Sequence, residues 1–97
     1  MSDNDINFLE TLEAVIQTRK GGDTDASYTA QLLAAGRSRI AQKVGEEAVE
    51  LALASVQDDR PEVVREAADL VYHLMVLLQS HELRLADVIR ELEDRHK

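Results

Sequence analysis

The sequence predicts an all-α fold, a bundle of four or five helices, and two observations lead to this class. Residues of high helix propensity are abundant, above all Ala, Leu, Glu and Arg, whereas only 3% of the chain is aromatic. Apolar residues recur at three- and four-residue spacing, and no alternating strand pattern competes with them. A chain of 97 residues has the length of one domain, so residues 1–97 are expected to form a single unit. Because so short a chain buries a marginal core, we expect homodimerisation to complete the bundle.

Two helices separated by a loop are expected in the first part of the chain. Residues 5–19 carry apolar side chains at helical spacing, which is typical of an amphipathic helix. Two glycines and several short polar residues then mark residues 20–26 as a loop. A short helix follows, capped by Ser27 or a nearby aspartate, and it continues through Leu33 before Gly36 ends it.

Three further helices are expected in the second part. An apolar stripe predicts a helix over residues 39–56. Pro61 follows a polar turn and indicates the start of a fourth helix, which extends to about Gln79. The centre of that helix, residues 70–78, is apolar nearly all round, which predicts burial on several sides. A final helix is expected from about Leu85.

The charge balance limits the classes of partner. Eleven Lys and Arg residues against 19 Asp and Glu residues give a net charge of −8, which disfavours binding of nucleic acid or anionic lipid. A phosphorylated ligand therefore requires a cation between it and the protein. The absence of cysteine excludes disulfides, thiolate zinc sites and a cysteine nucleophile, and it fits a reducing cytosol. The longest apolar run, residues 74–78, is far too short to span a membrane, and the N-terminus lacks the features of a signal peptide. A soluble cytoplasmic domain without membrane contact is expected.

Two carboxylates interrupt the pattern of the third predicted helix. Its apolar stripe continues through a glutamate, at Ile40, Val44, Glu47, Leu51 and Ala54. Glu47 therefore occupies a position typical of the core. Glu50 follows three residues later and lies roughly 60° round the same side of the helix.

The fourth predicted helix repeats this spacing with Glu66 and Asp69. Glu66 borders the apolar stripe, and Asp69 falls on a side that the apolar centre predicts to be covered. Because the connection is short, the two helices are expected to be antiparallel neighbours. Glu47 lies about ten residues before the turn and Asp69 about ten after it, so the two pairs can face each other.

Four carboxylates in one groove repel strongly, by roughly 4 kcal/mol for two charges about 4 Å apart at an effective dielectric near 20. Such a cluster holds either protons, with raised pKa values, or a cation. Oxygen-only ligands favour a hard ion, Mg²⁺ or Mn²⁺. One acidic pair on a helix is usually a solvated face, but two pairs at matched heights favour a metal site.

Other residues near these pairs allow more than one interpretation each. Glu46 points farther from the stripe and suits a group that supports a ligand, a base that orients water, or a surface glutamate. Lys43 is placed to meet a phosphate oxygen or to remain a surface charge. Gly45 lies inside a helix, where close packing explains it better than room for a ligand. His73 follows Asp69 by four residues, and a buried, hydrogen-bonded histidine is expected rather than a metal ligand.

Three further residues are candidates for substrate binding. Tyr28 belongs to a helix start but is also able to stack on a base. Arg37 and Arg39 follow Gly36 and are candidate phosphate contacts, with a solvated surface as the simpler alternative.

At its acidic positions the sequence resembles the all-α nucleoside triphosphate pyrophosphohydrolases, the MazG-like superfamily. The resemblance rests on Glu46-Glu47-x-x-Glu50 and, after fifteen intervening residues, Glu66-x-x-Asp69. Within the superfamily the sequence is most similar to the phosphoribosyl-ATP pyrophosphohydrolases of histidine biosynthesis. Three stretches support the narrower resemblance: residues 27–33, 43–50 and 66–74.

This resemblance implies the chemistry of the site. It implies that Glu47, Glu50, Glu66 and Asp69 bind Mg²⁺, and that phosphoribosyl-ATP and water give phosphoribosyl-AMP and pyrophosphate. A metal-bound water assisted by Glu46 is the simplest hypothesis for the attack. The resemblance also implies a cytoplasmic homodimer. The cyclohydrolase domain that some relatives carry in front is absent from the sequence, so a stand-alone form is expected.

Two other functions compete with this one. A housecleaning pyrophosphohydrolase for non-standard nucleotides needs the same metal site and a different base pocket. A non-catalytic helical module needs only the acidic surface, which meets a basic partner.

Overall fold

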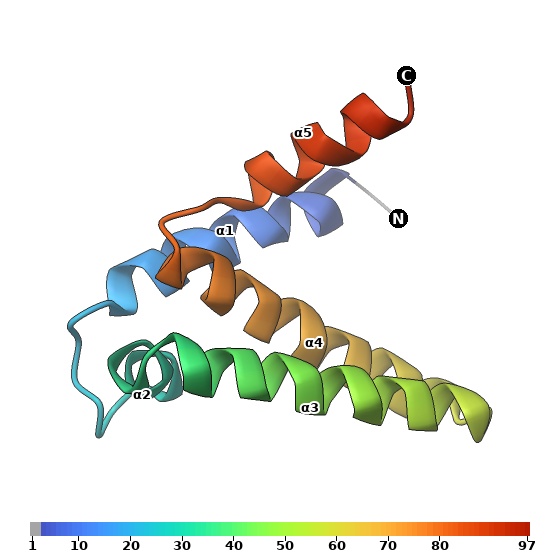
Figure 1. The fold of residues 1–97 in the computed structure, drawn as a ribbon, viewed down its shortest axis with the longest axis horizontal. Helices are drawn as coiled ribbons and strands as arrows, with labels where there is room; N and C mark the ends of the chain where they lie inside the picture. The colour runs from blue at the N-terminus through green and yellow to red at the C-terminus, as the bar shows by residue number, and fades with distance from the viewer. Residues whose placement is uncertain (1–2) are drawn as a thin grey trace.

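The structure is a computed structural model that describes residues 3–97, with side chains from residue 5 onward. Residues 1–2, part of the N-terminus from which the absence of a signal peptide was predicted, lie outside the described residues. The described chain is all-α and contains five helices (Figure 1): α1 (Asp3–Arg19), α2 (Tyr28–Ala35), α3 (Arg37–Val56), α4 (Arg60–Ser80) and α5 (Leu85–Arg95). The all-α class and the five predicted helices are confirmed.

Local signals explain where these helices begin and end. The Ser27 hydroxyl caps α2 by accepting a hydrogen bond from the Ala30 amide at 3.2 Å. Gly36, at φ 98°, separates α2 from α3 in a backbone conformation that favours glycine. The Asp59 carboxylate caps α4 by accepting from the Glu62 amide at 3.2 Å, and Pro61 lies in the first turn.

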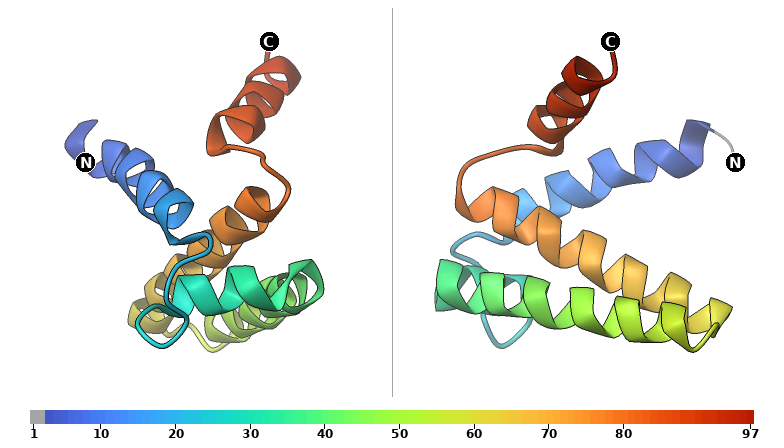
Figure 2. Two further views of the ribbon diagram at one scale, coloured as in Figure 1. Left: turned by 90° about the vertical axis from the view of Figure 1, so that its left-hand side faces the viewer. Right: turned by 45° about the vertical axis from the view of Figure 1, so that its right-hand side comes forward.

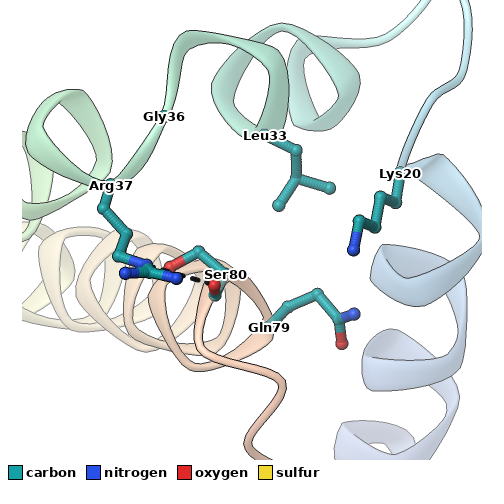
Figure 3. Close-up of a pocket in the computed structure, with 6 residues that line it drawn as sticks. All are labelled: Lys20, Leu33, Gly36, Arg37, Gln79 and Ser80. Carbon is teal, nitrogen blue, oxygen red and sulfur yellow. Dashed lines mark hydrogen bonds between the residues drawn. The ribbon is translucent and has the colours of Figure 1, made fainter.

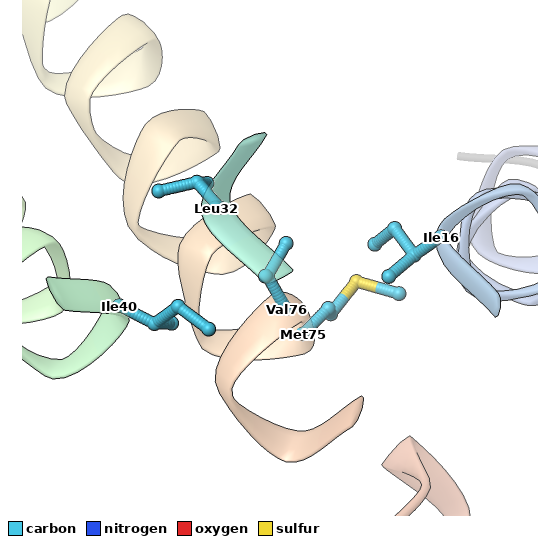
Figure 4. Close-up of a cluster of buried hydrophobic side chains, with 5 residues drawn as sticks. All are labelled: Ile16, Leu32, Ile40, Met75 and Val76. Atoms are coloured by element: carbon cyan, nitrogen blue, oxygen red, sulfur yellow. The ribbon is translucent and has the colours of Figure 1, made fainter. Parts of the chain in front are cut away.

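The longest helices, α3 and α4, form an antiparallel hairpin, and the core lies at one end of it. At this end α1 and α2 pack against the hairpin (Figures 1 and 2). The buried cluster joins one or two side chains from each of these four helices (Figure 4): Ile16, Leu32, Ile40, Met75 and Val76. The core therefore fixes the distance between α3 and α4 on one side of the acidic residues.

The prediction that the centre of α4 is buried on several sides is confirmed in part: His73, Met75 and Val76 are buried. Val71, however, is 40% exposed and the neighbouring leucines are only half-buried. The reason is that α1 and α2 cover only the end of the hairpin near Ile40. Beyond it several valines face solvent, and Val56 is 85% exposed.

The C-terminal helix contributes no buried residue. Two carboxylates hold its start: Asp87 of α5 itself, which accepts from the Arg84 amide at 2.8 Å, and Glu13 of α1. Glu13 accepts a hydrogen bond from the Leu85 amide at 2.7 Å and pairs with Arg84 at 3.2 Å. Farther along, α5 and α1 diverge (Figure 2). Across residues 3–97, no helix combines the length and the apolarity that crossing a membrane requires.

Candidate active site

The hairpin brings three of the four predicted metal ligands together. Glu47 of α3 and Glu66 and Asp69 of α4 each offer one carboxylate oxygen, and these oxygens lie within 4.8 Å of one another. The antiparallel pairing places Glu47 opposite the α4 pair, and the three-residue spacing keeps Glu66 and Asp69 on neighbouring positions of one face. We call these three residues together with Glu50 the acidic groove.

Two oxygens of the acidic groove are buried and have no partner among the described residues. They are Oε2 of Glu47 and Oε2 of Glu66. Glu47 is only 6% exposed, which confirms its predicted core position. A buried acceptor without a hydrogen bond costs about 1–3 kcal/mol, and more when it is charged. These atoms therefore suit a cation that binds there, and the oxygen-only donor set fits a hard ion.

The environment of Glu66 opposes its ionisation. The pKa of Glu66 is raised to about 7, and burial is the largest cause. The carboxyl groups of Glu50 and Glu62 add to the shift because they share hydrogen bonds with the protonated form. The negative charges of Glu50 and Glu47 raise the pKa further. Glu50 is exposed and lies outside the closest trio of oxygens, yet it is a direct neighbour of Glu66. The raised pKa of Glu66 is the behaviour expected of such a cluster when it holds a proton rather than a cation.

Asp69 differs from its prediction. It is exposed, because none of the five described helices covers that side of α4. Sequence analysis expected this side of α4 to be covered, because the centre of the helix is apolar. In the single chain that centre is only partly buried.

Lys43 already supplies one positive charge to this site. Its Nζ lies 3.3 Å from a carboxylate oxygen of Glu46 and 3.3 Å from Oε1 of Glu47. The two carboxylates raise the pKa of Lys43. In turn, the hydrogen bonds from Lys43 and Gln42 lower the pKa of Glu46, so Glu46 is ionised at neutral pH. Sequence analysis missed Gln42, although its four-residue spacing to Glu46 is a signal of such a contact.

Tyr28 connects α2 to the α4 turn that carries Asp69. His73 is buried, and its Nδ1 lies 2.7 Å from the Asp69 carbonyl oxygen, which can only accept. Nδ1 therefore carries the proton, and Nε2 accepts from the Tyr28 hydroxyl at 3.0 Å. The predicted buried, hydrogen-bonded His73 is confirmed. Tyr28 as a residue is 48% exposed, and its ring stacks on Tyr72, a residue that the sequence analysis did not single out.

The two arginines after Gly36 lie in different surroundings. The positive charge of Arg39, which is exposed, helps to lower the pKa of Glu46. Arg37 lines a separate cavity (Figure 3), where its Nε donates to the Ser80 carbonyl oxygen at 3.2 Å. It precedes Glu47 by ten residues, about 15 Å along a helix, so the chain does not bring Arg37 to the acidic groove.

Gly45 has no packing role within the described chain. A Cβ atom built there meets no atom within 4 Å, which contradicts close packing as the reason for this glycine. Gly45 instead lies in a shallow depression of about 560 Å³ on the outer side of α3, together with Gln42, Glu46, Val49 and Glu50. This surface adjoins the acidic groove and is open to a ligand or to another protein surface.

Comparison with known proteins agrees with this arrangement. The family model described as "Phosphoribosyl-ATP pyrophosphohydrolase" matches residues 9–96. The chain is also similar to proteins named "Histidine biosynthesis bifunctional protein HisIE". The one from Pasteurella multocida (strain Pm70) is 60% identical over 89 residues, which cover 92% of this chain and 44% of that protein. The one from Campylobacter jejuni subsp. jejuni serotype O:2 (strain ATCC 700819 / NCTC 11168) is 54% identical over 93 residues, covering 96% and 45%.

A third relative of the same name, from Yersinia pestis, is 52% identical over 94 residues, covering 97% of this chain and 46% of that protein. The chain thus spans about half the length of the curated relatives that it matches. The family match includes both helices of the acidic groove and nearly every other described residue. The chain therefore belongs to the phosphoribosyl-ATP pyrophosphohydrolase family.

Proposed function

We propose that this chain hydrolyses phosphoribosyl-ATP to phosphoribosyl-AMP and pyrophosphate in histidine biosynthesis, and that the reaction requires Mg²⁺. The observation that carries the proposal is the trio of carboxylate oxygens within 4.8 Å, two members of which also hold buried, unpartnered oxygens. The family supports the choice of substrate.

Glu47, Glu50, Glu66 and Asp69 would hold the metal ion. Mn²⁺ is expected to substitute for Mg²⁺, because both ions prefer oxygen ligands and octahedral geometry. When bound, the ion supplies neutralisation of the triphosphate charge and activation of water. Glu47 would be the one buried ligand of the four.

Glu46 and Lys43 complete the proposed catalytic set. Because Lys43 holds the pKa of Glu46 low, Glu46 is an ionised acceptor that orients a water molecule by hydrogen bonding. Lys43 bridges Glu46 and Glu47, and its flexible side chain is able to exchange one carboxylate for a phosphate oxygen of the substrate. This exchange would give the triphosphate a direct cationic contact in a chain of net charge −8.

The ring of the exposed Tyr28 is the proposed stacking surface for the purine. Its hydroxyl hydrogen-bonds His73, whose other ring nitrogen lies at the Asp69 carbonyl oxygen, so Tyr28 lies beside the turn of α4 that carries Asp69. Arg39 is the proposed contact to a substrate phosphate beside Glu46. Arg37 is a candidate for phosphate binding only in the separate cavity described above.

We propose that residues 1–97 form one catalytic domain that works as a cytoplasmic homodimer. Three exposed features support packing of a second copy on the hairpin: the partly exposed centre of α4, the exposed Asp69 and the open surface at Gly45. Such a cover would shield the acidic groove from bulk water and strengthen its electrostatic contacts.

The test is the release of pyrophosphate from phosphoribosyl-ATP, with ATP and dCTP as parallel substrates, each with Mg²⁺ and with a chelator. We expect metal-dependent release from phosphoribosyl-ATP and little from the other two. Release from ATP and dCTP alone would assign the chain to housecleaning of nucleotides. No release from any of them would favour a non-catalytic helical module.

A further inference from the structure

A cavity at the core end of the hairpin lies outside the acidic groove. It has a volume of about 370 Å³ and is enclosed by the end of α1, the α2–α3 junction and the end of α4 (Figure 3). Its lining is formed by Lys20, Leu33, Gly36, Arg37, Gln79 and Ser80. Figure 3 shows the side chains of Lys20 and Arg37 approaching this space from opposite sides.

The cavity is cationic, in contrast to the chain as a whole. No carboxylate from residue 5 onward lines it, although the chain carries 19 acidic residues. Neither Lys20 nor Arg37 forms an ion pair with any described residue. Six other cations do form such pairs: Lys43, Arg65, Arg84, Arg90, Arg95 and Lys97. Two unneutralised positive charges therefore converge on one space.

Arg37 is held in place at the cavity and keeps donors for an acceptor ligand. The Nε group of Arg37 donates to the Ser80 carbonyl oxygen at 3.2 Å, which anchors the guanidinium. Its two Nη groups have no hydrogen-bond acceptor among the described residues, so they remain available. Planar guanidinium donors bind phosphate oxygens in pairs, and a lysine adds a mobile point charge.

We propose that this cavity binds a phosphoryl anion, either inorganic phosphate or pyrophosphate or the phosphate of a nucleotide. Its volume is in the range of small-molecule sites, which favours a small ligand over a macromolecule. Arg37 lies about 15 Å along α3 from Glu47, so this site is distinct from the metal ligands. The proposal does not rest on the proposed enzymatic function.

Binding is tested by titrating the full chain with inorganic phosphate, pyrophosphate or AMP in metal-depleted buffer of low ionic strength. The absence of metal keeps anions out of the acidic groove, whose carboxylates repel them. Backbone amide NMR signals report where each anion binds. We expect saturable shifts centred on the residues that line the cavity. Tighter binding of AMP than of phosphate would assign a nucleotide ligand, and equal binding would assign an inorganic anion.

The decisive variant is Lys20→Gln combined with Arg37→Gln, which should weaken binding about tenfold or more through the loss of charge-assisted contacts. Its matched control is Arg90→Gln combined with Arg95→Gln, which removes the same charge from α5 and should bind normally. Arg37→Lys keeps the charge without the planar donors and should bind with intermediate affinity. Equal binding by the decisive variant and the control would overturn the proposal. So would acetate shifting the same signals as strongly as phosphate.

Discussion

The acidic groove and the C-terminal helix α5 are both rich in carboxylates, but the surroundings of these carboxylates differ. Three acidic residues of α5 each pair with a cation three or four residues later in the chain, and all these side chains are exposed: Asp87–Arg90, Glu91–Arg95 and Asp94–Lys97. In the groove, Glu47 and Glu66 carry buried oxygens without a partner. Exposed pairs of the first kind contribute about 0–1 kcal/mol each. The buried oxygens of the groove instead lack a partner and would be stabilised by a bound cation, which is a property of a binding site.

The largest expected effect is on turnover, because substitutions in the acidic groove should greatly lower it and substitutions in α5 should not. Glu47→Gln and Asp69→Asn remove one negative charge each from the groove with little change in volume. We expect either substitution to lower kcat/KM by about 100-fold or more, beyond the range for groups that only support a metal ligand. The measurement is pyrophosphate release at saturating Mg²⁺, with circular dichroism to check the helices.

Glu91→Gln is the matched control in α5, because it removes the same charge from an exposed ion pair. We expect activity within about twofold of the parent and stability within about 0.5 kcal/mol. If Asp69→Asn were as active as this control, the groove would not be the metal site.

A stability effect of the metal is expected next. An ion that binds only the folded state stabilises it by about 2.7 kcal/mol at one hundred times its Kd. For a domain of this size, each kcal/mol raises Tm by about 4–8 °C. Thermal unfolding with increasing Mg²⁺ should therefore show a rising Tm in the parent chain and in Glu91→Gln, and almost none in Glu47→Gln. A rise of the same size in all three proteins would place the ion elsewhere.

A smaller effect is expected from pH in the absence of metal. The pKa of Glu66 is about 7 in the folded chain, against an ordinary value of 4.5. Between these values the folded state holds a proton that the unfolded state has released, so raising the pH favours unfolding. The metal-free protein should lose stability as the pH rises from about 4.5 to 7. Urea unfolding across this window measures the slope.

Glu66→Gln should flatten this part of the profile, since it removes the group that holds the proton. Glu91→Gln should keep the parent slope. Over the same window the stabilisation by Mg²⁺ should grow, because the ion no longer competes with a proton. A steeper loss in Glu66→Gln than in the parent would contradict the assignment to this carboxyl group.

Local signals and periodicity explain why the helix ends and the burial of Glu47 could be predicted from the sequence. Ser27, Gly36 and Pro61 act on their own turns, so they mark helix ends without knowledge of the fold. Glu47 interrupts a stripe that is otherwise apolar, so its burial follows from spacing alone. Both effects depend only on residues within a few turns.

Contacts between distant segments could not be predicted in the same way. The Tyr28–His73 hydrogen bond joins residues 45 apart in the sequence. Arg37 and Arg39 are two residues apart in the sequence, but they point to different sides of α3. For this reason Arg37 lines a cavity, whereas Arg39 lowers the pKa of Glu46. The exposure of Asp69 depends on which element covers α4, and periodicity identifies an apolar face without identifying what packs on it.

The smallest expected effect concerns Gly45, where stability and function should move in opposite directions. Alanine is favoured over glycine by about 1 kcal/mol inside a helix, and no described atom lies within 4 Å of the added Cβ. Gly45→Ala should therefore raise the free energy of unfolding of the single chain. If the surface beside Glu46 and Glu50 receives substrate or a second copy, the same methyl group should lower activity or weaken association. Urea unfolding, pyrophosphate release and sedimentation of one protein preparation separate these effects. A Gly45→Ala chain that is more stable, equally active and equally associated would show that this surface of α3 remains open to solvent.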